Sequence, residues 1–334
     1  MSKAFPVLGF DIGGTKIAVC LATSEGKILG STRVDNKNRA PELVLPELVQ
    51  AGRRLLSEAK IAPNELKAVG IGSPAPMDFL KGMILTPPNM KTWRNVAIRD
   101  YLAKEFGVEA FFDNDANGGG LAEWLFGAGR GSSNMIYLTM STGIGGGVIA
   151  NGRLLRGKSF IAGEMGHIVL DLNGPKCNCG MTGCYEAFCG GRALAQRMQQ
   201  ELVGKPDSPI VKAAHGKVED IDVGCLVKAV KEKDPYALAL WDEMCLRNAQ
   251  AMGIFLNTFN PDMIILGTIA VHTGELFLAP LRNYLPRFCW NDTLAPCQIR
   301  ASELGPHIGE LSGVAIALNF LYERGDWQLP WQQA

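Results

Sequence analysis

The sequence lacks an excess of charge of either sign, a long apolar run and a secretion signal, and each absence excludes a class of protein. Lysine and arginine together number 33, as do aspartate and glutamate, so the formal net charge is zero. This balance argues against a nucleic-acid partner or an anionic membrane surface. No apolar run approaches the roughly 20 residues that a spanning helix needs. The opening MSKAFPVLGFDIGG has no apolar core or cleavage site of a signal peptide, so we expect a cytoplasmic protein.

Low-complexity segments and Ser- or Pro-rich linkers are also absent from the 334 residues, of which 47% are hydrophobic and 20% charged, as is typical of globular proteins. Two strand–Gly turn–strand patterns, at 7–22 and 135–150, predict two related α/β lobes joined by structured hinges. The spacing of apolar residues predicts helices over 41–59, 116–129 and 309–324, and a mostly helical segment over 191–256.

Two glycine-rich turns follow predicted strands. In the first, Asp11-Ile-Gly-Gly-Thr-Lys16, the glycines let backbone N–H groups approach an anion, and Asp11 could hold Mg²⁺ through water. A plain β-hairpin explains this turn equally well, because short glycine motifs are weak signals and this one is neither a Walker A loop nor G-x-G-x-x-G. The second turn is Ser141-Thr-Gly-Ile-Gly-Gly-Gly147. Two such turns could bind a phosphate chain between them, and finding both makes phosphate binding more plausible than one turn alone would.

A polar cluster, Asp113-Asn-Asp115-Ala-Asn117, lies where another strand is predicted to end. A carboxylate in this place can orient a hydroxyl and accept its proton. Aspartate and asparagine are also favoured helix N-caps. Both interpretations stay open, and these residues alone favour the cap.

Three of the nine cysteines are gathered in PKCNCGMTGCYE at 175–186, downstream of Gly163-Glu-Met-Gly-His167. Cytosolic thiols stay reduced, so a metal site explains the cluster better than a disulfide, although buried free thiols remain an alternative. His167, Cys177, Cys179 and Cys184 form a common closed tetrahedral zinc set, which leaves no open position for catalysis. The other cysteines are interpreted as core residues.

Glu164 and Glu186 flank this predicted metal loop. A rigid loop that presents two carboxylates could bind a polyhydroxylated ligand, because each oxygen accepts charge-assisted hydrogen bonds from sugar hydroxyls.

The motifs DIGGTK, DNDAN, STGIGGG, GEMGH and CNCGMTGCYEAF, in this order, resemble those of the ROK family of sugar kinases, from about residue 7 to residue 322. The resemblance implies a two-lobed, actin-like (ribonuclease H-like) α/β fold of the hexokinase superfamily, with ATP and sugar in the cleft between the lobes. The small lobe would comprise 1–117 and 307–334. The large lobe would comprise 118–306, with the zinc segment at 167–184.

The resemblance also implies roles for individual residues. Asp115 would be the general base, and His167 would serve sugar and zinc through its two ring nitrogens. The sugar-binding positions would be Asn114, Asp115, Glu164, His167 and Glu186. The positions for ATP with Mg²⁺ would be Asp11, Gly13, Gly14, Thr15, Lys16, Thr142, Gly143 and Gly267.

Three places depart from the family's pattern. The adenosine turn, usually rich in glycine, reads Leu266-Gly-Thr-Ile-Ala270, which leaves the phosphate donor open. Ala75 stands where the family usually has glycine near the sugar, and Cys189-Gly190 replaces a common Ser-Gly.

The resemblance implies an ATP-dependent glucokinase that forms glucose 6-phosphate, with the sugar and ATP as partners and a tendency to form homodimers. An N-acetylglucosamine, N-acetylmannosamine or fructose kinase of the same family is the alternative. A sugar-sensing repressor is not expected, because Asp11 leaves no room for a preceding DNA-binding domain.

Overall fold

The computed structural model describes residues 4–332, which fall into two compact units. The first unit comprises residues 1–133, 147–162 and 303–334, and the second comprises 134–146 and 163–302. The sequence predicted a boundary after residue 117, whereas the contacts place 118–133 and 147–162 in the first unit. The reason is that the helix over 115–126 packs against the C-terminal helix.

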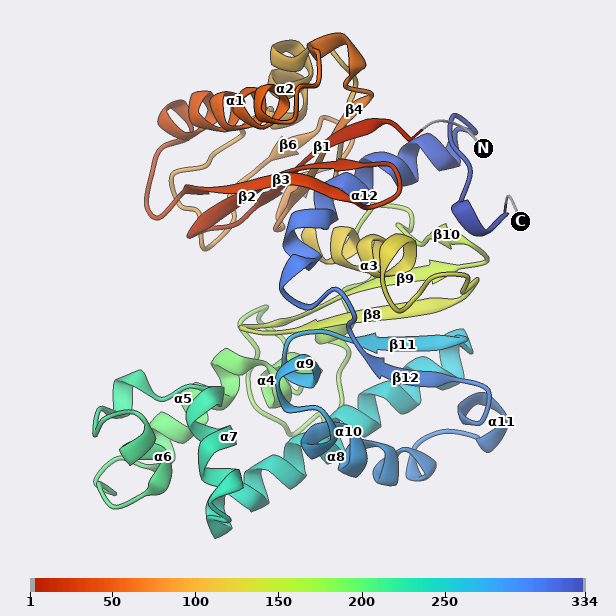
Figure 1. The fold of residues 1–334 in the computed structure, drawn as a ribbon. Helices are drawn as coiled ribbons and strands as arrows, with labels where there is room; N and C mark the ends of the chain where they lie inside the picture. The colour runs from red at the N-terminus through yellow and green to blue at the C-terminus, as the bar shows by residue number, and fades with distance from the viewer. Residues whose placement is uncertain (1–3, 333–334) are drawn as a thin grey trace. The chain divides into compact units, whose positions relative to one another are not determined.

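The first unit is built on a five-stranded sheet in the order β3-β2-β1-β4-β7, in which β1 is antiparallel to β2 and parallel to β4 (Figure 1). Its strands and helices are β1 (Pro6–Ile12), β2 (Lys16–Thr23), β3 (Ile28–Asp35), α1 (Pro41–Glu58), β4 (Ala68–Ser73), β5 (Met77–Asp78), β6 (Met83–Ile84), α2 (Ile98–Phe106), β7 (Ala110–Asn114), α3 (Asp115–Phe126), β10 (Arg153–Leu154) and α12 (Ile308–Glu323).

Helices cover both faces of this sheet: α1 and α2 lie on one face, and α12 lies on the other together with α3 (Figure 1). Helix α12 is buried from Leu311 to Leu318. It approaches the sheet closely because glycines meet there: a Cβ on Gly9 would lie 2.6 Å from the Val314 nitrogen, and one on Gly313 would lie 2.5 Å from the Phe10 nitrogen. The C-terminal segment therefore completes the core of the N-terminal sheet.

In the second unit, β11 lies between β8 and β12 and is parallel to both. Its strands and helices are β8 (Met135–Met140), α4 (Tyr185–Cys189), α5 (Gly191–Glu201), α6 (Pro209–Ala213), α7 (Val223–Lys231), α8 (Pro235–Phe259), β11 (Met263–Leu266), α9 (Ile269–Thr273), α10 (Glu275–Tyr284), α11 (Asn291–Leu294) and β12 (Gln298–Ala301). Strand β9 (Ile144–Ala150) begins in this unit and ends in the first, where it pairs with β10.

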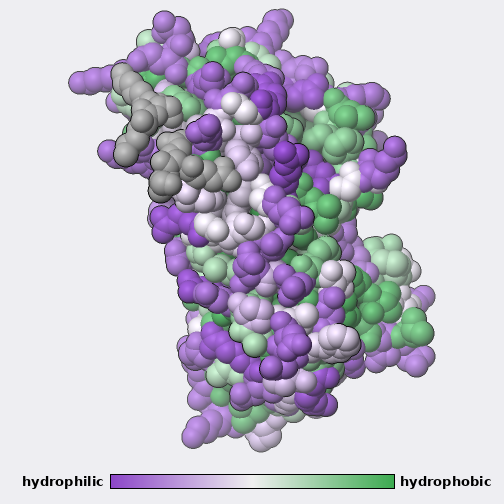
Figure 2. Space-filling model, turned by 90° about the vertical axis from the view of Figure 1, so that its right-hand side faces the viewer, coloured by the Kyte–Doolittle hydropathy of each residue, from purple (hydrophilic) through white to green (hydrophobic). Residues whose placement is uncertain are grey.

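The predicted secondary structure is confirmed in its main parts: both strand–turn–strand patterns, the helix at 41–58 with Pro46 inside it, and the helical segment after residue 190. Among residues 4–332, no helix is long and apolar enough to cross a membrane. On the face drawn in Figure 2, hydrophilic side chains predominate and hydrophobic residues form separate patches.

Candidate active site and metal centre

The first glycine-rich turn connects β1 to β2 and is tightly enclosed. A Cβ on Gly13 would lie 2.7 Å from the Lys16 carbonyl oxygen, and one on Gly14 would lie 2.6 Å from the Asn89 carbonyl oxygen. Both positions therefore require glycine. The Asn36 side chain donates to the Gly13 carbonyl at 2.7 Å, while Thr15 and Lys16 are exposed. The turn is thus held from behind and leaves its polar side chains accessible.

Asp11 stands at the end of β1, beside this turn. Burial, and secondly the charge of Asp115, raise the pKa of the Asp11 carboxyl from 3.8 to about 7. A Cβ on Gly309, in the first turn of α12, would lie 2.9 Å from Asp11 Oδ2, so there is little room around the carboxylate. Closely placed carboxylates of this kind favour a bound cation.

The junction of β7 and α3 settles which residue caps the helix. Asn114 is the N-cap, and its Oδ1 accepts from the backbone nitrogens of Ala116 at 2.9 Å and Asn117 at 3.4 Å. Asp115 is the first helical residue, and its Oδ1 accepts from the Ala116 nitrogen at 2.8 Å. The cap interpretation therefore holds for Asn114, and Asp115 is the first residue of the helix.

The second glycine-rich turn connects β8 to β9 and is held by groups of its own unit. Glu186 Oε2 accepts from the Ile144 nitrogen at 2.8 Å. The carbonyl oxygens of Ser141 and Thr142 accept from the first two backbone nitrogens of α5, at 2.8 and 2.9 Å. One oxygen of Glu186 is therefore engaged with the turn.

His167, Cys177, Cys179 and Cys184 converge as predicted, with all four ligand atoms within 4.8 Å of one another. His167 Nδ1 lies 3.7 Å from Cys177 Sγ, and Cys179 Sγ lies 3.6 Å from Cys184 Sγ. Tetrahedral zinc with Zn–S bonds of about 2.3 Å requires S···S separations of about 3.8 Å. The four residues therefore fit a structural zinc ion.

The orientation of His167 supports a double role for its ring. Nδ1 faces the thiols, while Nε2 lies 4.0 Å from Glu164 Oε2.

Burial raises the pKa of the Cys184 thiol to about 12, so the protein without a cation would hold this thiol neutral.

The remaining cysteines are free, and three of the five scattered ones, Cys20, Cys225 and Cys245, are buried as predicted. Cys289 and Cys297 are only half-buried, so the prediction that all five are core residues was wrong for these two. Cys189 is buried, with Sγ 3.7 Å from the Met244 carbonyl oxygen.

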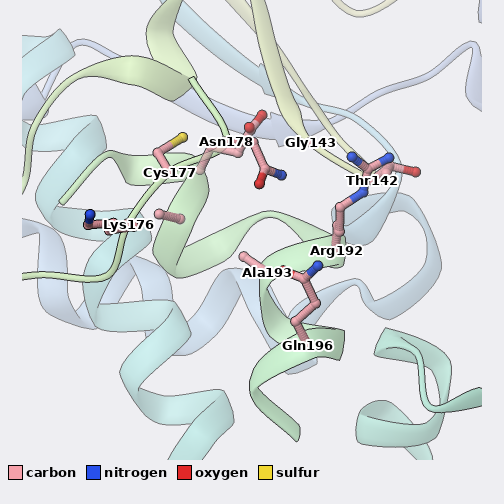
Figure 3. A pocket seen from close by; sticks show the side chains of 10 residues that line it. Thr142, Gly143, Lys176, Cys177, Asn178, Arg192, Ala193 and Gln196 are labelled. Carbon is pink, nitrogen blue, oxygen red and sulfur yellow. The ribbon is translucent and has the colours of Figure 1, made fainter. Parts of the chain in front are cut away.

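Two cavities of the second unit share Thr142 and Arg192. The smaller one, of about 230 Å³, also contains Gly143 and Glu186, and Figure 3 shows Arg192 extending from the start of α5 toward Thr142. The larger, of about 680 Å³ and mostly apolar, is lined by α5, α7 and α9. A nucleoside fits the volume and character of the larger cavity.

Part of the altered turn Leu266–Ala270 lies at the larger cavity, through Thr268 and Ile269. Thr268 lines that cavity with φ = +33°, a left-handed conformation that a β-branched residue rarely adopts. Gly267 is not among the lining residues; a Cβ there would lie 2.7 Å from the Tyr137 hydroxyl. The departure at Thr268 therefore lies at the wall of this cavity.

Sequence reasoning missed two cations beside these groups, Arg192 and Arg156. Arg192 lines both cavities, and Arg156 is paired with Asp113 at 2.8 Å. A single arginine outside a recognised motif carries no signal in one sequence, because its significance comes from residues far away along the chain.

Comparison with known proteins places these features in context. A family model described as the ROK family matches residues 7–319. A glucokinase of Thermotoga maritima is 36% identical over 93% of this chain and 96% of its own length. The crystal structure of a ROK hexokinase from Thermus thermophilus superposes with a TM-score of 0.82 at 31% identity, covering 97% of this chain and all of that one. A ROK family glucokinase from Streptomyces griseus, in complex with glucose and AMPPNP, superposes with a TM-score of 0.74 at 31% identity, covering 93% of this chain and 98% of that one.

Proposed function

The chain belongs to the ROK family, and from this premise we propose that it is an ATP-dependent glucokinase that transfers the γ-phosphoryl group of ATP to the 6-hydroxyl of glucose. Its solved relatives have the two-lobed, actin-like α/β fold of these kinases, as predicted. The similarity to glucokinases over nearly the whole chain carries the proposal. An N-acetylhexosamine or fructose kinase remains the alternative, to be distinguished by assay.

Asp115 is proposed as the general base. It lies at the first position of α3, where Asn114 supplies the cap, and its charge acts on Asp11. Phosphoryl transfer depends on positioning and charge neutralisation, so a carboxylate that accepts the sugar hydroxyl proton suffices. Asp11 would hold Mg²⁺ through water, because a cation offsets the mutual repulsion of the two carboxylates.

The sugar is proposed to bind Asn114, Glu164, His167 and Glu186 together with Asp115. The Asn114 oxygen is occupied by the helix cap, so the group that would donate to a hydroxyl is its amide nitrogen, which also donates to the Ser73 carbonyl oxygen at 3.5 Å. Glu186 has one oxygen engaged with the Ile144 nitrogen and one to accept from the sugar.

ATP is proposed to bind both glycine-rich turns. Gly13, Gly14, Thr15 and Lys16 of the first turn and Thr142 and Gly143 of the second would contact its phosphates, since close backbone approach is what these glycines permit. The nucleoside would occupy the 680 Å³ cavity past Gly267.

Zinc is proposed to be held by His167, Cys177, Cys179 and Cys184. With four protein ligands it would supply order to the loop between Glu164 and Glu186 and would take no part in the transfer. A reduced, zinc-bearing cysteine set is in keeping with a cytoplasmic location. A homodimer is the expected assembly on the family resemblance.

The test is Asp115→Asn in a coupled ADP-release assay over glucose, N-acetylglucosamine, N-acetylmannosamine and fructose. We expect glucose to have the highest kcat/KM with the wild type, phosphorus NMR to identify a 6-phosphate, and the variant to lose about 10²- to 10⁴-fold in kcat while calorimetry still detects glucose binding. A variant that turns over within a few-fold of wild type would show that Asp115 is not the base.

A further inference from the structure

One buried cation of the first unit contacts the strand end that leads into the proposed base. Arg156 follows β10, and only 11% of its side chain is exposed. Its Nε donates to Asp113 Oδ2 at 2.8 Å, and its Nη1 donates to the Glu323 carboxylate at 2.8 and 3.0 Å. The guanidinium lies 4.6 Å from the ring centre of Phe320 and 5.7 Å from that of Phe79. Two charges and two rings thus fix its orientation.

Asp113 transmits this constraint to the start of α3. Its Oδ1 accepts from the Asn114 nitrogen at 2.7 Å and from Asn117 Nδ2 at 2.8 Å, and its side chain is 1% exposed. One carboxylate therefore holds the residues on both sides of Asp115. A rotation of Asp113 would release the Asn114 nitrogen and the first turn of the helix together.

Arg156 also closes the loop that it begins. Its carbonyl oxygen accepts from the Ala162 nitrogen at 3.1 Å. Within this loop Phe160, at φ = +62°, stacks on Phe79 with ring centres 4.1 Å apart. The loop is therefore held by a main-chain hydrogen bond and by the Phe79 ring, which the guanidinium also contacts.

The arrangement is not the one that stability alone would favour. Arg156 Nη2 is buried without a hydrogen-bond partner among the described residues, and an unsatisfied buried donor costs about 1–3 kcal/mol. Buried ion pairs are often no more stabilising than apolar side chains of similar volume. The direct contact of Arg156 with Asp113 indicates that this ion pair fixes the position of the Asp113 carboxylate.

We propose that Arg156 is a positioning residue for phosphoryl transfer, which acts through Asp113 to hold Asp115 at the start of α3. This inference rests on the proposed function, since it takes Asp115 as the base. Arg156 itself needs no contact with sugar or nucleotide.

The test compares Arg156→Lys with Glu323→Gln. Lysine keeps the charge but cannot reproduce the guanidinium fork, so Asp113 loses its fixed partner. Glu323→Gln loosens the other side of the arginine and leaves the bond to Asp113. In an assay at a temperature well below the Tm of the variant, we expect Arg156→Lys to have a kcat about tenfold or more lower than the wild type. Its KM for ATP should be unchanged. Glu323→Gln should keep kcat within about twofold of wild type despite a lower Tm.

Asp113→Asn provides a second measurement that does not depend on the folding of an arginine variant. It should lower kcat to a similar extent, and the double variant with Arg156→Lys should be no slower than the slower single variant, because the two act in series. A wild-type kcat in folded Arg156→Lys, additive effects in the double variant, or a kcat loss that follows Tm equally in Glu323→Gln would overturn the inference. Active Asp115→Asn would overturn the assignment of the base in the proposed function instead.

Discussion

Replacing Asp11 by asparagine should make the protein more stable at alkaline pH while it abolishes activity. Raising the pKa of a carboxyl from 3.8 to about 7 corresponds to about 4 kcal/mol of folding free energy that is lost when the group ionises. The first turn of α12 lies beside the carboxylate and offsets up to about 2 kcal/mol of this penalty. We therefore expect Asp11→Asn to gain about 2–4 kcal/mol at pH 8.

The sign follows from the direction of the shift. Below about pH 4 the carboxyl is protonated in both the folded and the unfolded chain, so ionisation costs nothing. As the pH rises toward 7, the unfolded chain ionises first, and the stability of the wild type falls relative to the variant. Above pH 7 the difference stays constant. The free energy of unfolding of the wild type is thus undiminished at acid pH, where Asp11 is neutral, and it falls as the pH rises to about 7.

Thermal unfolding at pH 4.5 and pH 8 measures this difference. At about 2 °C per kcal/mol, the Tm of Asp11→Asn should exceed that of the wild type by about 4–8 °C at pH 8 and by much less at pH 4.5. Asp35→Asn is the matched control, because it makes the same chemical change at an exposed position at the end of β3 in the same sheet. Equal Tm differences at both pH values would refute the reasoning.

Two further predictions concern the second unit. Elemental analysis should find one zinc per chain in the wild type and none in Cys179→Ser, while the control Cys297→Ser should keep its zinc. Cys179→Ser should also have a lower Tm and a KM for glucose raised about tenfold, with its affinity for ATP unchanged. A zinc-free wild type with full activity would contradict this prediction. Val227→Trp should fill part of the 680 Å³ cavity and raise the KM for ATP about tenfold without changing glucose binding. Lys231→Trp, at an exposed position on the same helix, is the control. An unchanged KM for ATP in Val227→Trp would exclude the cavity as the nucleoside site.

How far the sequence predicts the site depends on how local each interaction is. The zinc ligands were predictable, because three of them lie within eight residues and their chemistry has few alternatives. The helix cap was predictable as a possibility, but only the structure assigns it to Asn114 rather than Asp115.

Interactions between distant segments were beyond the sequence. Arg156 meets Asp113 and Glu323, which lie 43 and 167 positions away, so no spacing in the sequence signals the contact. The unit boundary was misplaced for the same reason, since α3 belongs with a helix formed near the other end of the chain.

That helix has a consequence for how the protein is made. The sheet of β1, β4 and β7 emerges from the ribosome early, whereas α12, which covers one face of it, is synthesised almost last. At about 5–20 residues per second, β1 waits roughly 15–60 s for its partner. During this interval the face of the sheet around Gly9 and Gly70, which α12 covers in the complete fold, is available to chaperones and proteases. A chain stopped before Ile308 would therefore be degraded rather than accumulate as a partly folded kinase.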